Sequence, residues 1–237
     1  HHNFTLNQIE KDGFPIADRI ESLFNSDQKS SRAKGLAVQL AGLVQSVSRI
    51  EPDFLLDLGD REESIATALT GAYLDIPVAH LCGGDKVIGN VDDVVRHAVT
   101  KLSHLHFTTN EASRERVLKL GEEPFRVHNV GNPGLDRFRA VPQMTPEALL
   151  LELGFSRKDL EQPLLMVVQH PLSSEAEKTY DQMKETLEAI KELNFPTVVT
   201  YPNSGPGNHG IIRCIQEYRG LDNLRIFRNV PTTTFVN

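Results

Sequence analysis

Tryptophan is absent from this chain of 237 residues, and cysteine occurs only twice. Cys82 and Cys214 are too few and too far apart to build a disulfide framework, which favours a reducing cytoplasm. No apolar run approaches the roughly 20 residues that cross a bilayer, and no basic segment followed by an apolar one opens the chain. The sequence therefore predicts a cytoplasmic protein with no membrane partner.

Basic residues are scarce relative to acidic ones. The chain has 25 Lys and Arg against 32 Asp and Glu, which gives a formal net charge of −7. This balance argues against a nucleic-acid partner, and an anionic ligand would need a local cationic pocket. Apolar residues make up 39% of the chain, enough for a sizeable core, and the length predicts one large or two smaller domains.

Short apolar segments alternate with segments of helical spacing along the chain. The first series has predicted strands at 53–58, 76–81, 105–108 and 125–130, with helices at 62–73, 92–102 and 111–120. A weaker region at 138–164, interpreted as an interdomain hinge, precedes a second series with strands at 164–168, 197–201 and 224–227 and helices at 173–193 and 210–219. The alternation predicts an α/β protein with two Rossmann-like domains built on parallel sheets, at 1–142 and 143–237. The second domain stops at the start of a helix, so the chain is interpreted as a fragment.

The most informative stretch runs from residue 56 to residue 107. Its apolar segments end abruptly in Gly-Asp-Arg (59–61), His-Leu-Cys-Gly-Gly-Asp (80–85) and His-Leu-His (104–106). In open α/β sheets, ligands bind at the carboxyl ends of the strands. The stretch therefore predicts the active-site face of an enzyme.

Two acid–arginine pairs lie in this stretch. Asp60 and Arg61 follow a predicted strand, where Asp60 would face a ligand and Arg61 would meet a phosphate or balance the acid. The alternative is that Asp60 only caps the following helix. Asp92 and Arg96 lie four residues apart, an ordinary ion-pair spacing. That pair gains weight because Asp92 opens a helix after the glycine-bearing loop 83–89, whose backbone N–H groups can approach an anion.

The histidines allow several interpretations. His104 and His106 share one face of a strand, which suits metal ligation. No third ligand lies at a recognisable spacing, so a pair of hydrogen-bonded histidines is favoured and no metal is predicted. His170 ends a strand of the second series, where it would hold or protonate a phosphate or serve only the structure. Asn203 ends the next strand in the same manner. Cys82 is more typical of a small buried hydrophobe than of a nucleophile.

Four motifs stand out together: Gly-Asp-Arg (59–61), His-Leu-Cys-Gly-Gly-Asp (80–85), the segment Asp92 to His106, and Gln-His-Pro (169–171). Taken together they resemble the hydrolysing UDP-N-acetylglucosamine 2-epimerases. The resemblance extends over nearly the whole chain, through residues 9–14, 130–136 and 201–203. It implies a two-domain, glycosyltransferase-B-like fold, no cofactor, and a homo-oligomer, either a dimer or a tetramer.

The resemblance also implies a reaction. In that family a base removes the proton from the sugar carbon that bears the acetamido group, UDP is eliminated, and water adds to the glycal to give N-acetylmannosamine. By resemblance, Asp60 and Asp92 match acidic catalytic positions, and His170 matches the histidine on the nucleotide side. Further matches and neighbours complete the predicted substrate-binding set, which consists of Arg61, Cys82, Arg96, His104, His106 and Asn203. The implied partner is UDP-N-acetylglucosamine or a related UDP-diacetamido sugar that feeds sialic-acid-like synthesis.

Two departures from the family pattern leave alternatives open. Many members carry a glutamate where this chain has Cys82, and a thiol with a pKa of about 8.5 replaces a carboxylate poorly. Asp85, three residues on, is the predicted substitute acid. The family's N-terminal Arg-Ala-Asp-like turn and its C-terminal Asn-Ser-Ser-Gly phosphate loop are not in this chain. The alternatives are a nucleotide-sugar-binding homologue without turnover, or a glycosyltransferase of the same architecture.

Overall fold

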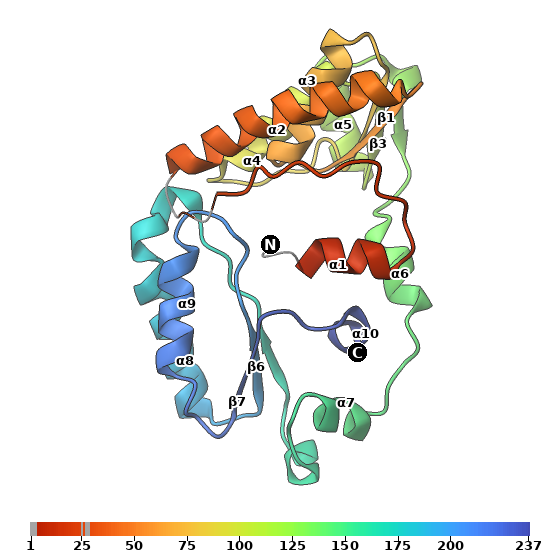
Figure 1. Cartoon of the computed structure of the whole chain (residues 1–237). Helices are drawn as coiled ribbons and strands as arrows, with labels where there is room; N and C mark the ends of the chain where they lie inside the picture. The colour runs from red at the N-terminus through yellow and green to blue at the C-terminus, as the bar shows by residue number, and fades with distance from the viewer. Residues whose placement is uncertain (1–3, 25, 27–28) are drawn as a thin grey trace. The chain divides into compact units, whose positions relative to one another are not determined.

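The computed structural model describes residues 4–24, 26 and 29–237 (Figure 1). These residues form two compact units. The first unit is Pro15–Asp136, and the second combines His1–Phe14 with Arg137–Asn237. Each unit contains one parallel sheet.

This division differs from the predicted domains 1–142 and 143–237 at both ends. The second unit includes helix α1 (Phe4–Lys11) and most of helix α6 (Gly134–Ala140). Two contacts within the second unit join these segments, because Arg137 is 3.7 Å from the Asp12 carboxylate and the Asn237 amide donates to the Pro142 carbonyl at 3.1 Å.

The first unit is a four-stranded parallel sheet in the order β1-β2-β3-β4. Its strands are β1 (Leu55–Leu58), β2 (Val78–Leu81), β3 (Leu105–Thr108) and β4 (Val127–Asn129), the last preceded by a 3₁₀ turn, η1 (Pro124–Arg126). The connecting helices are α3 (Glu62–Tyr73), α4 (Val91–Leu102) and α5 (Glu111–Lys119), and α2 (Lys29–Ile50) packs on α3. Each of these three connecting helices follows the carboxyl end of one strand and leads to the amino end of the next.

The sequential strand order determines which face of the first sheet the connecting helices cover. Right-handed crossovers between neighbouring parallel strands put α3, α4 and α5 on the same face of the sheet. On that face a row of polar side chains runs straight across the strands, because Asp57 is in register with His80 and His80 with His106. All three side chains are buried. Leu56 and Leu58 point to the other face, where they are 66% and 62% exposed.

The second unit has a three-stranded parallel sheet in the order β5-β6-β7. Its strands are β5 (Leu165–Val167), β6 (Thr197–Thr200) and β7 (Leu224–Phe227). The helices α8 (Thr179–Leu193) and α9 (Asn208–Glu217) lie side by side on one face, over the core of Met183, Leu187, Ile211 and Ile215. Leu150 of α7 (Pro146–Glu152) and Leu153, which caps the end of that helix, pack on the other face against Val198. The remaining elements are η2 (Arg157–Glu161), η3 (Ser173–Lys178) and α10 (Thr232–Val236).

The predicted strands and helices of the two series are present with ends shifted by a few residues, except that residues 173–178 of the predicted helix at 173–193 form the 3₁₀ segment η3 and the α-helix begins at Thr179. The predicted hinge at 138–164 contains α7 and η2, which supply part of the core of the second unit. Asn110 caps α5, since its side chain accepts from the Ser113 N–H at 2.9 Å. Helix α2 was not predicted, although Leu36, Leu40, Leu43 and Val47 have helical spacing.

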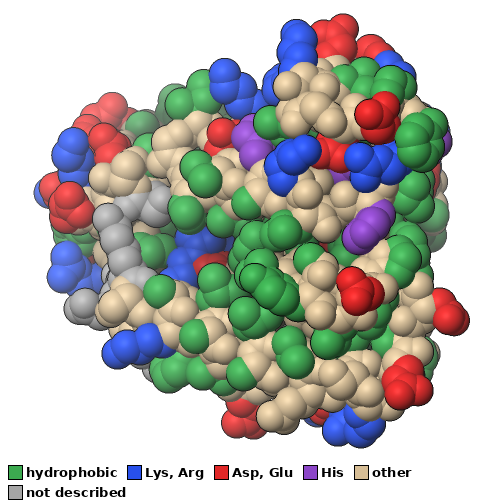
Figure 2. Space-filling model, turned by 90° about the horizontal axis from the view of Figure 1, so that it is seen from above, with side chains coloured by type: hydrophobic (Ala, Val, Ile, Leu, Met, Phe, Trp, Pro, Cys, Tyr) green, Lys and Arg blue, Asp and Glu red, His purple; other side chains and the backbone are tan. Residues whose placement is uncertain are grey.

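Acidic and basic side chains are interspersed over the face shown in Figure 2, and hydrophobic side chains gather near its centre. Among the described residues, no helix combines the length and apolar character needed to span a membrane.

Candidate functional site

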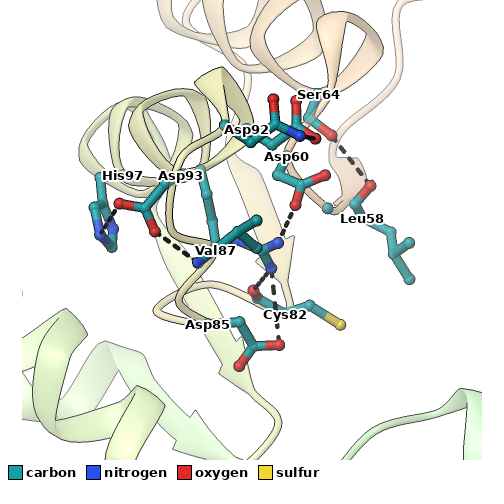
Figure 3. A network of polar contacts seen from close by, with 12 residues as sticks. Leu58, Asp60, Ser64, Cys82, Asp85, Val87, Asp92, Asp93 and His97 are labelled. Atoms are coloured by element: carbon teal, nitrogen blue, oxygen red, sulfur yellow. Dashed lines mark hydrogen bonds and ion pairs between the residues drawn. The ribbon is translucent and has the colours of Figure 1, made fainter. Parts of the chain in front are cut away.

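Polar side chains from two loops and a helix converge at the carboxyl edge of the sheet in the first unit (Figure 3). Asp60 follows β1, Cys82 and Asp85 follow β2, and Arg96 lies on α4, which starts from the same edge. The Arg96 guanidinium is ion-paired with Asp60 and donates to the Cys82 carbonyl at 2.7 Å. It also lies 3.7 Å from the Asp85 carboxylate. One arginine thus holds two carboxylates and a strand end together.

Arg96 is the centre of this cluster, because its side chain is only 8% exposed. A buried guanidinium needs paired acceptors, and Asp60, Asp85 and the Cys82 carbonyl supply them. The i,i+4 spacing predicted a pair with Asp92 instead. The register of the strands overrides that local pattern, since it brings Asp60 to Arg96 across 36 residues.

Asp60 has a partly buried carboxyl with a raised pKa. Burial raises the pKa of its carboxyl above the ordinary value, the Arg96 charge opposes that rise, and the Asp92 charge adds to it. A carboxylate with a raised pKa is a stronger base than one in water. The alternative that Asp60 only caps a helix does not hold, since the N-cap of α3 is Arg61 and has no side-chain capping bond. Arg61, a predicted substrate-binding residue, is thereby next to Asp60 at the edge of the site.

Asp85 is fixed by three contacts. One of its oxygens accepts from the hydroxyls of Thr109 and Ser113, each at 2.6 Å, and the other faces Arg96 at 3.7 Å. Asp85 also lines an open pocket of about 600 Å³ with Arg96, Arg116 and hydroxyl and amide side chains. The carboxylate therefore reaches the same guanidinium as Asp60, as a substitute acid would have to.

Asp92 lies in the first turn of α4, where the helix dipole stabilises a negative charge. It accepts from Arg32 of α2 at 2.9 Å and from the Asn90 amide at 2.8 Å. Arg32 is also ion-paired with Glu62. The next residue, Asp93, orders the loop before α4, because it accepts from the Val87 N–H at 2.9 Å (Figure 3).

Cys82 has an unusual backbone. Its φ of +63° lies in the left-handed region that non-glycine residues rarely adopt, and such strain collects at functional sites. Burial raises the pKa of its thiol, and the Asp85 charge raises it further. Figure 3 shows the sulfur pointing away from the Asp85 carboxylate. Cys82 therefore takes part in the cluster through its carbonyl oxygen rather than through its thiol.

Gly84 allows the loop after β2 to close on α5. Its φ is +79°, and an added Cβ would lie 2.2 Å from the Ser113 carbonyl oxygen. We expect Gly84→Ala to destabilise the protein by about 2–4 kcal/mol, from left-handed strain plus overpacking against backbone. Gly121→Ala is the matched control, because Gly121 has φ +89° and open space around it. Urea unfolding of both variants separates the cost of the left-handed backbone from the cost of steric overlap with Ser113. Equal losses of unfolding free energy in the two variants would contradict the close approach of Gly84 to Ser113.

His104 and His106 are not brought to this edge. The His104 ring accepts from the Val78 N–H at 3.2 Å, at the amino end of β2. His106 is fully buried and contacts Glu122 at 3.1 Å, beyond the end of α5. Burial lowers the pKa of His106, and Glu122 opposes this. The ring of each contacts a partner on the amino side of the sheet, and the predicted part of both histidines in substrate binding stays a prediction.

In the second unit, His170 and Asn203 follow β5 and β6. The His170 ring accepts from the Asn203 N–H at 3.1 Å, so the two predicted residues are in contact. Asn203 accepts from the Gly205 N–H at 3.0 Å and so shapes the loop after β6. The carboxyl edge of this sheet also borders a cavity of about 340 Å³, lined by residues that include Tyr201, Arg228 and Phe235.

Several residues of the first site were missed at the level of sequence. Arg32, Thr109, Ser113 and Arg116 contact the cluster or its loop, since Arg116 donates to the Gly84 carbonyl. Only the neighbouring helix start at Asn110 gave a signal for Thr109 and Ser113. Among the described residues, no group of three or more His, Cys, Asp or Glu side chains has the geometry of a metal site.

Comparisons with known proteins match the chain to one family. Residues 1–237 match the family model described as UDP-N-acetylglucosamine 2-epimerase. The UDP-N,N'-diacetylbacillosamine 2-epimerase (hydrolyzing) of Legionella pneumophila is 34% identical over 233 residues, which cover 98% of this chain and 61% of that protein. The GDP/UDP-N,N'-diacetylbacillosamine 2-epimerase (hydrolyzing) of Campylobacter jejuni is 29% identical over 236 residues, 98% of this chain and 60% of that protein. The chain thus spans about three fifths of these relatives.

Solved structures agree on the fold. The crystal structure of the Neisseria meningitidis UDP-GlcNAc 2-epimerase bound to UDP-GlcNAc matches with a TM-score of 0.77 at 18% identity, over 99% of this chain and 64% of that one. A Listeria monocytogenes structure of a protein described as a UDP-N-acetylglucosamine 2-epimerase matches with a TM-score of 0.75 at 16% identity, over 99% and 60%. The predicted fold class, α/β with parallel sheets and a partial second domain of glycosyltransferase-B-like type, is confirmed.

Proposed function

Because the chain belongs to the UDP-N-acetylglucosamine 2-epimerase family, we propose that its protein is a hydrolysing 2-epimerase acting on a UDP-linked 2-acetamido sugar. The observation that carries this proposal is the buried Arg96 with Asp60 and Asp85 on its guanidinium. A sugar C–H bond is only weakly acidic, so its cleavage needs a strong, positioned base and a stabilised negative charge. The cluster supplies both.

In this proposal Asp60 is the general base. Its carboxylate removes the proton from the carbon that bears the acetamido group, and the C–H electron pair forms the double bond of a glycal. The bond between the anomeric carbon and the diphosphate oxygen breaks, and UDP leaves with the electron pair of that C–O bond. Water then adds to the anomeric carbon, and a proton returns to the second carbon from the opposite side. Asp92 and Asp85 are the candidate acids for these later proton transfers, and Arg96 balances their charge.

We assign the nucleotide to residues of the second unit. His170 and Asn203 lie at a carboxyl strand edge, where phosphates bind in α/β proteins. The Arg228 side chain and the aromatic rings of Tyr201 and Phe235 line the adjacent cavity of about 340 Å³. A cation and apolar rings suit the phosphate and base of a uridine nucleotide. The family resemblance further implies a homodimer or homotetramer, which light scattering on the full-length protein would check.

The experiment is incubation of the full-length protein with UDP-N-acetylglucosamine, and separately with a UDP-2,4-diacetamido sugar, in deuterated water. We expect UDP release together with deuterium at the second sugar carbon of the product. The names of the two relatives favour the diacetamido sugar as the faster substrate. UDP release without deuterium at that carbon would contradict the elimination. Binding without release would favour the alternative of a nucleotide-sugar-binding homologue, which Cys82 in place of the family's glutamate supports.

Asp85 rather than Cys82 is expected to be the second acid. Asp85 contacts Arg96, whereas the Cys82 sulfur points away from Asp85 (Figure 3). We therefore expect Asp85→Asn to lower kcat by about 10²-fold, the typical contribution of a positioned acid or base. Cys82→Ser should cause a clearly smaller loss. Steady-state UDP release compares the two variants, and a larger loss for Cys82→Ser would reverse the assignment.

A further inference from the structure

His80 lies on β2 beneath the helices, and its side chain is completely buried. Its Nε2 atom is 2.8 Å from the Gly59 carbonyl oxygen, and its Nδ1 atom is 3.2 Å from the Thr100 hydroxyl oxygen. The proposed reaction uses neither ring nitrogen directly. Each ring nitrogen of His80 thus has one partner within the first unit.

The two partners lie beside the two central residues of the site. Gly59 directly precedes Asp60, so its carbonyl belongs to the turn that directs the Asp60 carboxylate. Thr100 is one helical turn beyond Arg96, and its hydroxyl is 3.0 Å from the Arg96 carbonyl oxygen. The imidazole thus joins the turn that carries Asp60 to the helix turn that carries Arg96.

The partners also determine the tautomer of the ring. A carbonyl oxygen only accepts, so Nε2 carries the hydrogen and donates it to Gly59. Burial lowers the pKa of His80 to about 4, so the ring is neutral at physiological pH and Nδ1 is an acceptor. The single hydrogen of the Thr100 hydroxyl then has two acceptors within reach, Nδ1 and the Arg96 carbonyl oxygen, and it is donated to one of them at a time. An added Cβ at Gly83 would lie 3.1 Å from Nδ1 and 3.2 Å from the Thr100 hydroxyl oxygen, so the loop after β2 closes over this bond.

We propose that His80 is a positioning residue, a neutral bridge that holds the Gly59–Asp60 turn at a fixed distance from Arg96. The inference rests on the proposed function, because it gives Asp60 the role of the base. Proton abstraction depends steeply on the position of the base, and a displacement of about 1 Å costs on the order of 10²-fold in rate. A rigid, uncharged bridge maintains that position without adding charge to the acidic cluster.

Two substitutions of His80 test its bonds to Gly59 and to Thr100 separately. The amide nitrogen of Gln extends about as far as Nε2, so His80→Gln keeps a donor for Gly59. The shorter Asn keeps only an acceptor for Thr100. In the full-length protein we expect His80→Asn to lower kcat by about 10²-fold with KM changed less than about threefold. His80→Gln should recover at least about tenfold of that loss. His209→Asn, an exposed position in the second unit, is the control.

A second readout keeps the inference separate from the proposed function. The ¹³C resonance of the Asp60 carboxyl, recorded without substrate, should move in His80→Asn and stay near the wild-type position in His80→Gln. If the wild type releases no UDP, the proposed function fails, and this resonance still decides whether His80 positions Asp60. Equal rates for His80→Asn and wild type, or an unmoved Asp60 resonance in His80→Asn, would overturn the inference. Equal losses in both variants with lowered melting temperatures would assign His80 to folding alone.

Discussion

Asp60→Asn should lower the rate of deuterium incorporation at the second sugar carbon by about 10³-fold, within the range of a lost general base. The variant keeps the shape of the side chain and a hydrogen-bond acceptor for Arg96. It removes the basicity that burial gives to Asp60, whose pKa is raised above its ordinary value. The measurement is mass spectrometry of the product formed in deuterated water.

The matched control is Asp53→Asn. Asp53 is exposed and lies before the amino end of β1, whereas Asp60 follows its carboxyl end. The control should retain wild-type turnover, and both variants should unfold at similar urea concentrations. Turnover of Asp60→Asn within about threefold of the wild type would remove Asp60 from the mechanism, since the assignment as base predicts a loss of orders of magnitude.

Asp57→Val should stabilise the protein at neutral pH. Asp57 is 7% exposed, and its Oδ2 atom has no hydrogen-bond partner among the described residues. Burial raises the pKa of its carboxyl to about 6, the Ser64 side chain and the Leu58 backbone oppose the rise, and Glu63 adds to it. At 1.36 kcal/mol per pKa unit, this shift corresponds to about 2–3 kcal/mol of destabilisation once the carboxyl is ionised. Valine suits a strand and carries no charge.

The contribution of Asp57 to the free energy of unfolding depends on pH. Because the pKa of Asp57 is raised in the folded state, the folded protein holds a proton that the unfolded chain releases near pH 4. Wild-type stability from this group is therefore complete below about pH 4 and is lost as the pH rises to about 6. The difference in unfolding free energy between Asp57→Val and wild type should grow over that window and then level off. A difference that is constant from pH 4 to pH 8 would show that Asp57 does not titrate there.

The helices and strands of both series followed from local pattern, because apolar alternation and helix caps such as Asn110 act over a few residues. The bounds of the two units did not follow from local pattern, and they differ from the predicted domains. Residues 137–142 group with the second unit, where Arg137 and Pro142 contact residues far away in the chain. Helix α2 was overlooked even though its apolar spacing is regular, and with it Arg32, the partner of Asp92.

Some features of the candidate site were likewise evident from the sequence and others were not. The positions of Asp60, Asp85 and Arg96 at strand ends and helix starts were evident, since polar residues that interrupt apolar runs mark the carboxyl edge of a sheet. Their pairing was not evident, because Arg96 binds Asp60 across the sheet rather than Asp92 on its own helix. His104 and His106 had the right residue type and spacing for a site. Only their partners, Val78 and Glu122, show that they face the amino side.

By itself the sequence determined the α/β class, the order of the elements and the residue types available at the carboxyl edges. These follow from short-range preferences and from the polar interruptions of apolar runs. Only the tertiary structure decided which charges neutralise one another, which carboxylates are desolvated, and that a buried neutral imidazole, His80, bridges Gly59 and Thr100. The physical reason is that burial and long-range pairing depend on strand register, and register is fixed by the packing of the whole unit.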